Sequence, residues 1–249
     1  MRGSAVSVNF QGVAAVNKCL KNIQEYLLPR VCVTCGQGVA GCSTAELDLC
    51  LGCLTAMPYL GSACRQCALP LVEPGVCGRC LKTPPPFEQT FSLFRYAHPI
   101  DYLIQQLKFN RRLVNARLLG ALMAELLQQK GQRLPDIIVP VPLHRRRLQS
   151  RSYNQAVELA RPVSQRLGVA MDVSCCRRLR ETAVQSDLPA KARRANIKGA
   201  FDVSGVLNGK HVAIIDDVMT TGNTVTELAQ LMRDNGVRIV DVWVCARVP

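Results

Sequence analysis

The sequence is most informative at Val212-Ala-Ile-Ile-Asp-Asp-Val-Met-Thr-Thr-Gly-Asn-Thr224. It begins with four apolar residues, as a buried strand does, and continues with two adjacent acids and a loop rich in threonine. A predicted helix from about 223 to 235 follows, and Gly236 ends it. In open α/β sheets, ligands bind where strands end in such loops. The pattern therefore predicts an α/β fold with a ligand site after this strand.

The loop of this segment has the chemistry of a phosphate cradle. Amides at a helix N-terminus and threonine hydroxyls donate hydrogen bonds to an anion, and Gly222 lets the backbone approach without a side chain. The two acids instead accept hydrogen bonds from neutral hydroxyls, because carboxylates facing a phosphate would repel it. The combination indicates a sugar phosphate. The alternative is a simple helix N-cap at Asp217 or Thr221, which would leave the second acid unexplained.

The surrounding sequence alternates apolar strands with helical patterns. Strands are predicted at 136–141, 211–216 and 238–244, and further helices at 100–107, 118–131 and about 153–167. Apolar strands separated by helices indicate a largely parallel sheet that is covered on both faces.

Ten of the thirteen cysteines precede residue 81, and eight of them form four C-x-x-C pairs: Cys32/Cys35, Cys50/Cys53, Cys64/Cys67 and Cys77/Cys80. Each pair can aim two thiolates at one ion, and two pairs complete a tetrahedral zinc site. Two structural Zn2+ ions are therefore predicted, with sequential pairing as the simplest topology and an interleaved one left open. A redox centre is the alternative, but four such pairs in about 50 residues favour metal.

Three prolines, at 84–86, mark a domain boundary, because they remove backbone donors and fix an extended conformation. We predict an amphipathic helical segment at 1–29, a double zinc ribbon at 30–83 and a further domain at 88–249. The ribbon region has few aromatic residues, so metal ligation would supply most of its stability. The remaining cysteines lack ligand spacing and are interpreted as bystanders or buried residues: Cys19, Cys42, Cys175, Cys176 and Cys245.

The formal charge of +13 is concentrated in the middle of the chain. Residues 91–200 carry +13, against +2 for 1–90 and −2 for 201–249. This excess favours a phosphate-bearing partner, either a small metabolite or a nucleic acid, with a solvated basic surface as the alternative. We find no apolar run near the roughly 20 residues of a membrane span and no secretory cleavage site, so a cytoplasmic location is expected.

Residues 212–224 resemble the 5-phosphoribosyl-1-diphosphate (PRPP) motif of type I phosphoribosyltransferases. The ComF/GntX family is similar over nearly the whole chain from Cys32. It joins a double zinc ribbon to a phosphoribosyltransferase-like domain and is associated with competence and DNA uptake. Its other matching segments are Val139-Pro-Val-Pro-Leu-His144, Arg151-Ser-Tyr-Asn-Gln155, Arg193-Arg-Ala-Asn196 and Lys198-Gly-Ala-Phe201. The resemblance implies a type I phosphoribosyltransferase-like fold, mainly a parallel sheet flanked by helices, preceded by a small zinc-ribbon domain.

The resemblance also implies roles for particular residues. The ribose hydroxyls of PRPP would be held by Asp216 and Asp217, and its 5-phosphate by Thr220, Thr221, Gly222, Asn223 and Thr224. The pyrophosphate, with Mg2+ chelated by the ligand, would lie at Leu143, His144, Arg145 and Arg146. A solvated charge run is the alternative for the arginines. Gln185–Asn196 is either a loop that closes over the ligand or an ordinary exposed loop.

A catalytic base is harder to identify. Purine-salvage relatives have an aspartate before the Thr-Gly pair, where this chain has Thr220, which departs from that chemistry. His144 and Glu158 are conceivable bases. The aromatic candidates for stacking on an acceptor are Phe94, Tyr96, Phe109 and Tyr153.

Three alternative functions are consistent with these sequence features. The first is an enzyme that transfers phosphoribose to an unidentified acceptor. The second is a non-catalytic, PRPP-responsive protein that binds single-stranded DNA through residues 108–117 and 145–151, or binds a DNA-uptake protein. The third is a scaffold without turnover. We favour a PRPP-binding, phosphoribosyltransferase-type protein that acts in DNA uptake.

Overall fold

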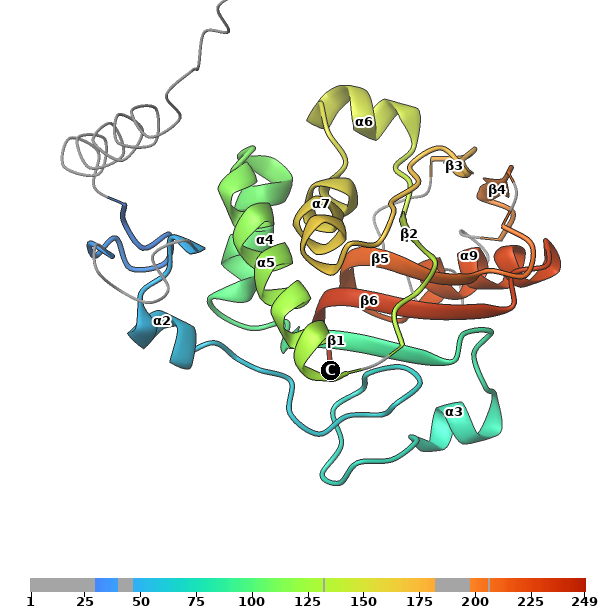
Figure 1. Cartoon of the computed structure of the whole chain (residues 1–249), viewed down its shortest axis with the longest axis horizontal. Coiled ribbons are helices and arrows are strands. Elements are labelled where there is room, and N and C mark those ends of the chain that lie inside the picture. The colour runs from blue at the N-terminus through green and yellow to red at the C-terminus, as the bar shows by residue number, and fades with distance from the viewer. Residues whose placement is uncertain (1–29, 40–46, 132, 182–197, 206) are drawn as a thin grey trace, which may run out of the picture. The chain divides into compact units, whose positions relative to one another are not determined.

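The computed structural model describes residues 30–39, 47–131, 133–181, 198–205 and 207–249 (Figure 1). The chain divides into two compact units, each with most of its contacts inside itself. The first unit ends at Ala56 and the second begins at Met57. Several sequence predictions lie outside the described residues: the helical segment 1–29 with Cys19, the bystander Cys42, and the segment Gln185–Asn196.

The first unit contains the first two C-x-x-C pairs. Val31 bridges to Gly38, and the short helix α2, Leu51–Thr55, carries the second pair at its start. Cys50 is the N-cap of α2, and its sulfur accepts a hydrogen bond from the backbone N–H of Cys53 over 3.4 Å. Among the described residues of this unit only Cys32, Val39 and Leu49 are buried hydrophobic residues, which is consistent with stabilisation by a bound metal.

The second unit is built on a four-stranded sheet in the order β1-β6-β5-β2 (Figure 1). The strands are β1 (Gln89–Arg95), β2 (Ile137–Pro140), β5 (His211–Met219) and β6 (Ile239–Arg247), and all three pairings are parallel. Strands β5 and β6 are buried along nearly their whole length, which explains their continuous apolar sequences. The three predicted strands correspond to β2, β5 and β6.

Helices cover both faces of this sheet. They are α4 (Ile100–Phe109), α5 (Leu113–Gln129), α7 (Gln155–Leu167) and α9 (Asn223–Asp234). The short helix α6 (Arg145–Arg151) follows β2 and has no buried residue. Helix α9 packs in one core cluster with Val240, Val242 and Val244 of β6. The end of α4 contacts the opposite face of β5, and α7 packs on α5, β5 and β2. Within the described residues, no helix has the length and apolar character to cross a bilayer.

The last two C-x-x-C pairs belong to the second unit. Cys64 and Cys80 are buried in the same core cluster as α9 and β6, and the short helix α3, Gly78–Lys82, carries the fourth pair. Backbone hydrogen bonds join Leu60 to Leu93 and Thr90 to Arg65, so this segment lies along β1. The boundary between the compact units thus falls inside the segment predicted as one double zinc ribbon. The domain bounds 1–29, 30–83 and 88–249 remain a proposal about sequence organisation.

A buried polar network joins the amino ends of the central strands. The side chains of His211 and Asp241 are each 5% exposed, and His211 Nε2 lies 2.9 Å from Asp241 Oδ2. Gln89 Nε2 on β1 donates to the same carboxylate oxygen over 3.1 Å. Because these residues lie at the end of the strands opposite to Asp216, the network does not line the candidate site.

Candidate functional site

Asp216 and Asp217 lie at the carboxyl end of β5 and, as neighbours in a strand, face opposite sides of the sheet. Asp217 is 3% exposed, and its Oδ2 lies 2.7 Å from Nζ of Lys108 on α4. Burial, and then the negative charge of Asp217, raise the pKa of Asp216 to about 7. The structure thus brings both predicted ribose ligands to one strand end and holds one of them in an ion pair.

Lys108 is a site residue that sequence analysis assigned to a cationic surface track. Burial alone would lower its pKa, but the charge and the hydrogen bond of Asp217 outweigh burial and raise it. Its ammonium therefore neutralises Asp217, and its charge also favours the ionised form of Asp216. No sequence pattern pairs Lys108 with an acid so distant in the chain, so only the fold reveals the contact.

The loop Thr220–Thr224 connects β5 to α9. Gly222 is the N-cap of α9 with φ 82°, a left-handed conformation that favours glycine, and an added Cβ would lie 2.5 Å from Cε of Met219. The N–H groups of the first helical turn point toward this loop, and no acid occupies that turn. The loop therefore presents the positive end of a helix without a carboxylate that would repel an anion.

The predicted pyrophosphate turn follows β2. His144 is the N-cap of α6, and its Nδ1 accepts a hydrogen bond from the N–H of Arg146 over 3.4 Å. The side chains of Arg145 and Arg146 are exposed, and Arg146 forms a 3.3 Å surface ion pair with Glu181. The turn thus has its cations on the outside, where they can reach a diphosphate.

Arg178 connects this turn with the acid pair. It lies on β3 (Cys176–Arg178), which pairs with β4 (Phe201–Val203), and it forms an isolated bridge with His144. Burial is the main cause that lowers the pKa of Arg178; the charge of Arg147 acts in the same direction and that of Asp216 opposes it. Arg178 therefore lies within electrostatic reach of Asp216 and of Arg147 on α6. Sequence analysis missed it because β3 is short and carries no apolar pattern.

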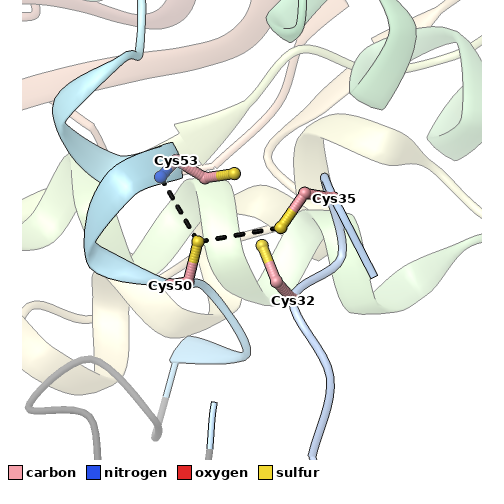
Figure 2. A group of neighbouring side chains, drawn as sticks. All are labelled: Cys32, Cys35, Cys50 and Cys53. Atoms are coloured by element: carbon pink, nitrogen blue, oxygen red, sulfur yellow. Dashed lines mark hydrogen bonds between the residues drawn. The ribbon is translucent and has the colours of Figure 1, made fainter. Parts of the chain in front are cut away.

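The eight paired cysteines form two tetrads, and the first is shown in Figure 2. In each tetrad the sulfurs lie within 4.8 Å of one another, and the pairing is sequential. Cys35 and Cys50 sulfurs are 3.7 Å apart, and Cys67 and Cys77 sulfurs are 3.6 Å apart. Tetrahedral zinc with bonds of about 2.3 Å requires sulfurs about 3.8 Å apart, so both tetrads fit the ion.

Backbone N–H groups stabilise a thiolate in the second tetrad. The N–H of Cys77 donates to the sulfur of Cys64 over 3.3 Å. Burial disfavours the Cys64 thiolate, but backbone hydrogen bonds from Cys77 and Cys67 outweigh burial and lower its pKa to about 7. Thiolate is the form that ligates zinc, so these two tetrads support structural zinc.

Comparisons with known proteins agree with this architecture. A family model described as a phosphoribosyl transferase domain matches residues 113–249, more than half of the chain, and a double zinc ribbon domain matches 23–81. DNA utilization protein YhgH of Salmonella typhimurium is 40% identical over 225 residues, covering 88% of this chain and 98% of that protein. Competence protein F of Haemophilus influenzae is 35% identical over 214 residues, covering 82% and 92%.

The chain belongs to the ComF family of phosphoribosyltransferase-domain proteins. The predicted family and fold class, a parallel sheet flanked by helices with zinc-ribbon cysteine clusters, are confirmed. Among solved structures, this ComF-family chain is similar to the glutamine PRPP amidotransferase from B. subtilis complexed with ADP and GMP. The two are 19% identical with a TM-score of 0.36, over 52% of this chain and 25% of that chain.

The ComF-family chain has a cavity of about 680 Å³ next to the pyrophosphate turn. Its walls combine cations with apolar and aromatic side chains, among them Leu143, Arg145, Leu148, Tyr153, Arg177 and Arg178. The cavity can therefore accommodate an anion that also carries an apolar part.

The residues considered for the acceptor side have other partners. Phe94 is fully buried and packs on Tyr59 with ring centroids 5.2 Å apart. The hydroxyl of Tyr153 donates to the carbonyl of Leu107. The carboxylate of Glu158 lies 3.2 Å from Nε of Arg161, and His144 caps α6. Within the part of the chain that the structure describes, Phe94 is thus unsuited to stacking on an acceptor, and Glu158 is already paired.

Proposed function

We propose that this ComF-family protein binds PRPP at the carboxyl ends of β2 and β5. One observation supports the proposal above the others: an acid pair, Asp216 and Asp217, lies near the end of β5, and residues 218–221 then lead to the glycine-capped N-terminus of α9. A site for an inorganic anion alone would be weakened by carboxylates beside it. A ligand that carries both hydroxyls and phosphates uses the acids and the loop together.

PRPP has three parts, and the site offers a matching group for each. The 5-phosphate would accept hydrogen bonds from the loop Thr220–Thr224, and the ribose hydroxyls would donate to Asp216 and Asp217. The diphosphate would lie at the turn Leu143–Arg146, with Arg178 as an added cation. Mg2+ would reach the site chelated by PRPP and would neutralise part of the diphosphate charge. A cytoplasmic location agrees with this proposal, because reduced thiols are needed to hold zinc.

If the protein turns over, the step is displacement at C1 of the ribose. The nucleophile of the acceptor forms a bond to C1, the bond from C1 to the diphosphate oxygen breaks, and pyrophosphate leaves with the electron pair. Arg145, Arg146 and Arg178 would stabilise the charge that develops on the leaving group. The acceptor releases its proton to a base, and His144 is the candidate nearest to the pyrophosphate turn.

A second candidate function is PRPP-responsive binding without turnover. It is supported by the acceptor side, where Phe94 is buried and Glu158 is paired with Arg161. Thr220 also stands at the position where purine-salvage relatives have an aspartate base. A screen of acceptors for pyrophosphate release distinguishes the two functions, because the binding protein releases none.

Replacing both Asp216 and Asp217 by asparagine is expected to weaken PRPP binding by 10-fold or more, while inorganic phosphate binding changes less than about 3-fold. The acids accept from the ribose hydroxyls, whereas the phosphate cradle consists of loop amides and threonine hydroxyls. Isothermal titration with each ligand measures the two affinities. Asp202→Asn and Asp234→Asn, outside the site, form the control. Equal weakening of both ligands would remove the ribose assignment.

We further propose that single-stranded DNA binds on the cationic surface of α5 and α6. The names of two relatives, a DNA utilization protein and a competence protein, support a DNA-related role. Arg111 Nη2 donates to Oγ of Ser152 over 3.2 Å, so the start of α5 lies next to the end of α6. The segments 108–117 and 145–151 therefore form one surface. Lys108 is paired with Asp217 and does not belong to it.

Reversing Arg111, Arg112 and Arg117 to glutamate is expected to reduce single-stranded DNA affinity at least 100-fold while PRPP affinity changes little. These side chains are exposed and belong to α5 and the segment before it, not to the strand ends of the site. Backbone phosphates would dominate the affinity, so wild-type binding should weaken steeply with salt and vary little with sequence. Fluorescence anisotropy with a labelled oligonucleotide measures this.

The matched control reverses Lys210, Arg233 and Arg238, three cations at or near the amino ends of β5 and β6, with the same change in net charge. It should bind DNA almost as the wild type does. If the wild type shows no DNA affinity even at low salt, this surface serves a protein partner instead. If the α5 variant folds but loses PRPP, the charge belongs to the small-ligand site.

A further inference from the structure

Arg247, the last residue of β6, is a buried arginine whose partners are backbone carbonyls. It is 2% exposed. Its Nε donates to the carbonyl of Cys67 over 2.9 Å. Its Nη1 donates to the carbonyls of Met219 over 3.1 Å and Thr220 over 2.5 Å, and also to that of Val248. One guanidinium thus joins two segments that are distant in the sequence.

These two segments have separate roles. Cys67 belongs to the second cysteine tetrad, whereas Met219 ends β5 and Thr220 begins the proposed phosphate loop. A cavity of about 570 Å³ lies between them, with Cys80 and the proline run on one side and Thr221 and Asn223 on the other. Because packing does not fill this space, the guanidinium is a direct connection between the ribbon and the loop.

The charge of Arg247 is a second reason to connect this residue with the second tetrad. Within the described residues, no carboxylate lies within 4.0 Å of its guanidinium. A buried cation without a counter-charge is costly. Four thiolates around Zn2+ carry a net charge of about −2, and Nε of Arg247 is hydrogen-bonded to the backbone of Cys67, one of the four predicted ligands. With zinc bound, the second tetrad would supply the negative charge that the buried guanidinium requires.

We propose that Arg247 is a positioning residue that makes the conformation of the loop Thr220–Thr224 depend on zinc in the second tetrad. The guanidinium holds the carbonyls that begin the loop, and the zinc thiolates stabilise the guanidinium. The first tetrad belongs to the other compact unit, so the proposal concerns the second tetrad alone. The link to ligand binding rests on the proposed function, whereas the dependence of the loop on the ribbon does not.

Hydrogen exchange of the ligand-free protein tests the loop directly. In Arg247→Met, amides of residues 220–224 should exchange at least 10-fold faster than in the wild type, because the hydrogen bonds to the carbonyls of Met219 and Thr220 at the start of the loop are lost. Amides in the middle of β5 and the content of two zinc ions should stay unchanged. Arg233→Met is the matched control: this exposed arginine on α9 also donates to a backbone carbonyl, that of Arg238. Wild-type exchange in a folded Arg247→Met overturns the proposal.

Zinc release gives a second measurement, because a ligand that binds the ordered loop also stabilises the zinc-loaded second tetrad when the two sites are coupled. Saturating ribose 5-phosphate should slow the transfer of one of the two zinc ions to a colorimetric chelator about 10-fold, and Arg247→Lys should largely remove this slowing. Arg247→Lys keeps the buried positive charge but loses the planar guanidinium that donates to several carbonyls at once. This variant replaces Arg247→Met in the experiment if Arg247→Met does not fold. Slowing that persists in full in Arg247→Lys contradicts the proposal. If neither ribose 5-phosphate nor Mg-PRPP binds, the proposed function fails, while loop exchange still decides the role of Arg247.

Discussion

Replacing Cys80 by serine is expected to unfold the sheet-bearing second unit, whereas replacing Cys53 leaves that unit folded. Cys80 is 3% exposed and lies in the core cluster shared by the ribbon, α9 and β6, while Cys53 belongs to the first unit. Structural zinc contributes on the order of 10 kcal/mol to folding, which exceeds the stability of most domains. Trp243, the single tryptophan, is 3% exposed on β6 and reports unfolding of the sheet by fluorescence.

Metal analysis accompanies this experiment. The wild type should contain two zinc ions per chain, and Cys53→Ser should contain one with the Trp243 emission of the folded protein. One zinc ion in the wild type, together with a Cys80→Ser variant that unfolds at the wild-type temperature, would show that the second tetrad is not a metal site.

Replacing Lys108 by methionine is expected to lower the free energy of unfolding by about 3 kcal/mol, because Asp217 is left as a buried carboxylate without its cation. It should also raise the pKa of Asp216 above its value of about 7, since the charge of Lys108 lowers that pKa. A raised carboxyl pKa favours the protonated form in the folded state. Stability should therefore fall as pH rises from about 4 to about 7, and this window should extend upward in the variant.

Chemical denaturation and carbon-13 titration of the aspartate carboxyls measure these two effects. The double variant Lys108→Met/Asp217→Asn should recover much of the stability, because no unpaired charge remains. Lys130→Met, which removes a lysine located over the Phe91 ring, should cost less than about 1 kcal/mol. An unchanged Asp216 titration in Lys108→Met would show that the ion pair does not influence the site.

Local pattern was sufficient to predict the core of the fold. Strand β5 and the loop to α9 carry an uninterrupted apolar run, two acids and a glycine, and each feature has a local physical cause. The predicted helix at 153–167 begins only at Gln155, because Ser152 has φ 70° and Asn154 caps the helix through the N–H of Ala156. Helix α6 contains three consecutive arginines and has no apolar periodicity. The sequence therefore predicted a cationic segment there but not a helix.

Sequence analysis missed three residues of the candidate site and its surroundings. Each of them is placed there by a contact with a residue distant in the sequence. Lys108 pairs with Asp217, Arg178 lies beside His144, and Arg247 contacts Cys67. In each case the partners are separated by more than thirty positions, so no local pattern can couple them. The position of the second cysteine tetrad within the sheet-bearing unit has the same origin, since equal C-x-x-C spacings do not reveal which core each pair joins.

Calorimetric titration with PRPP in the presence of Mg2+ tests the central claim most directly. We predict one binding event per chain, with an affinity at least 10-fold higher for Mg-PRPP than for ribose 5-phosphate, since only PRPP also engages the turn Leu143–Arg146 and Arg178. Arg178→Met should remove most of this difference. Equal affinity for the two ligands would eliminate the pyrophosphate subsite, and absence of binding to a zinc-loaded, folded protein would contradict the claim that this chain is a PRPP-binding protein.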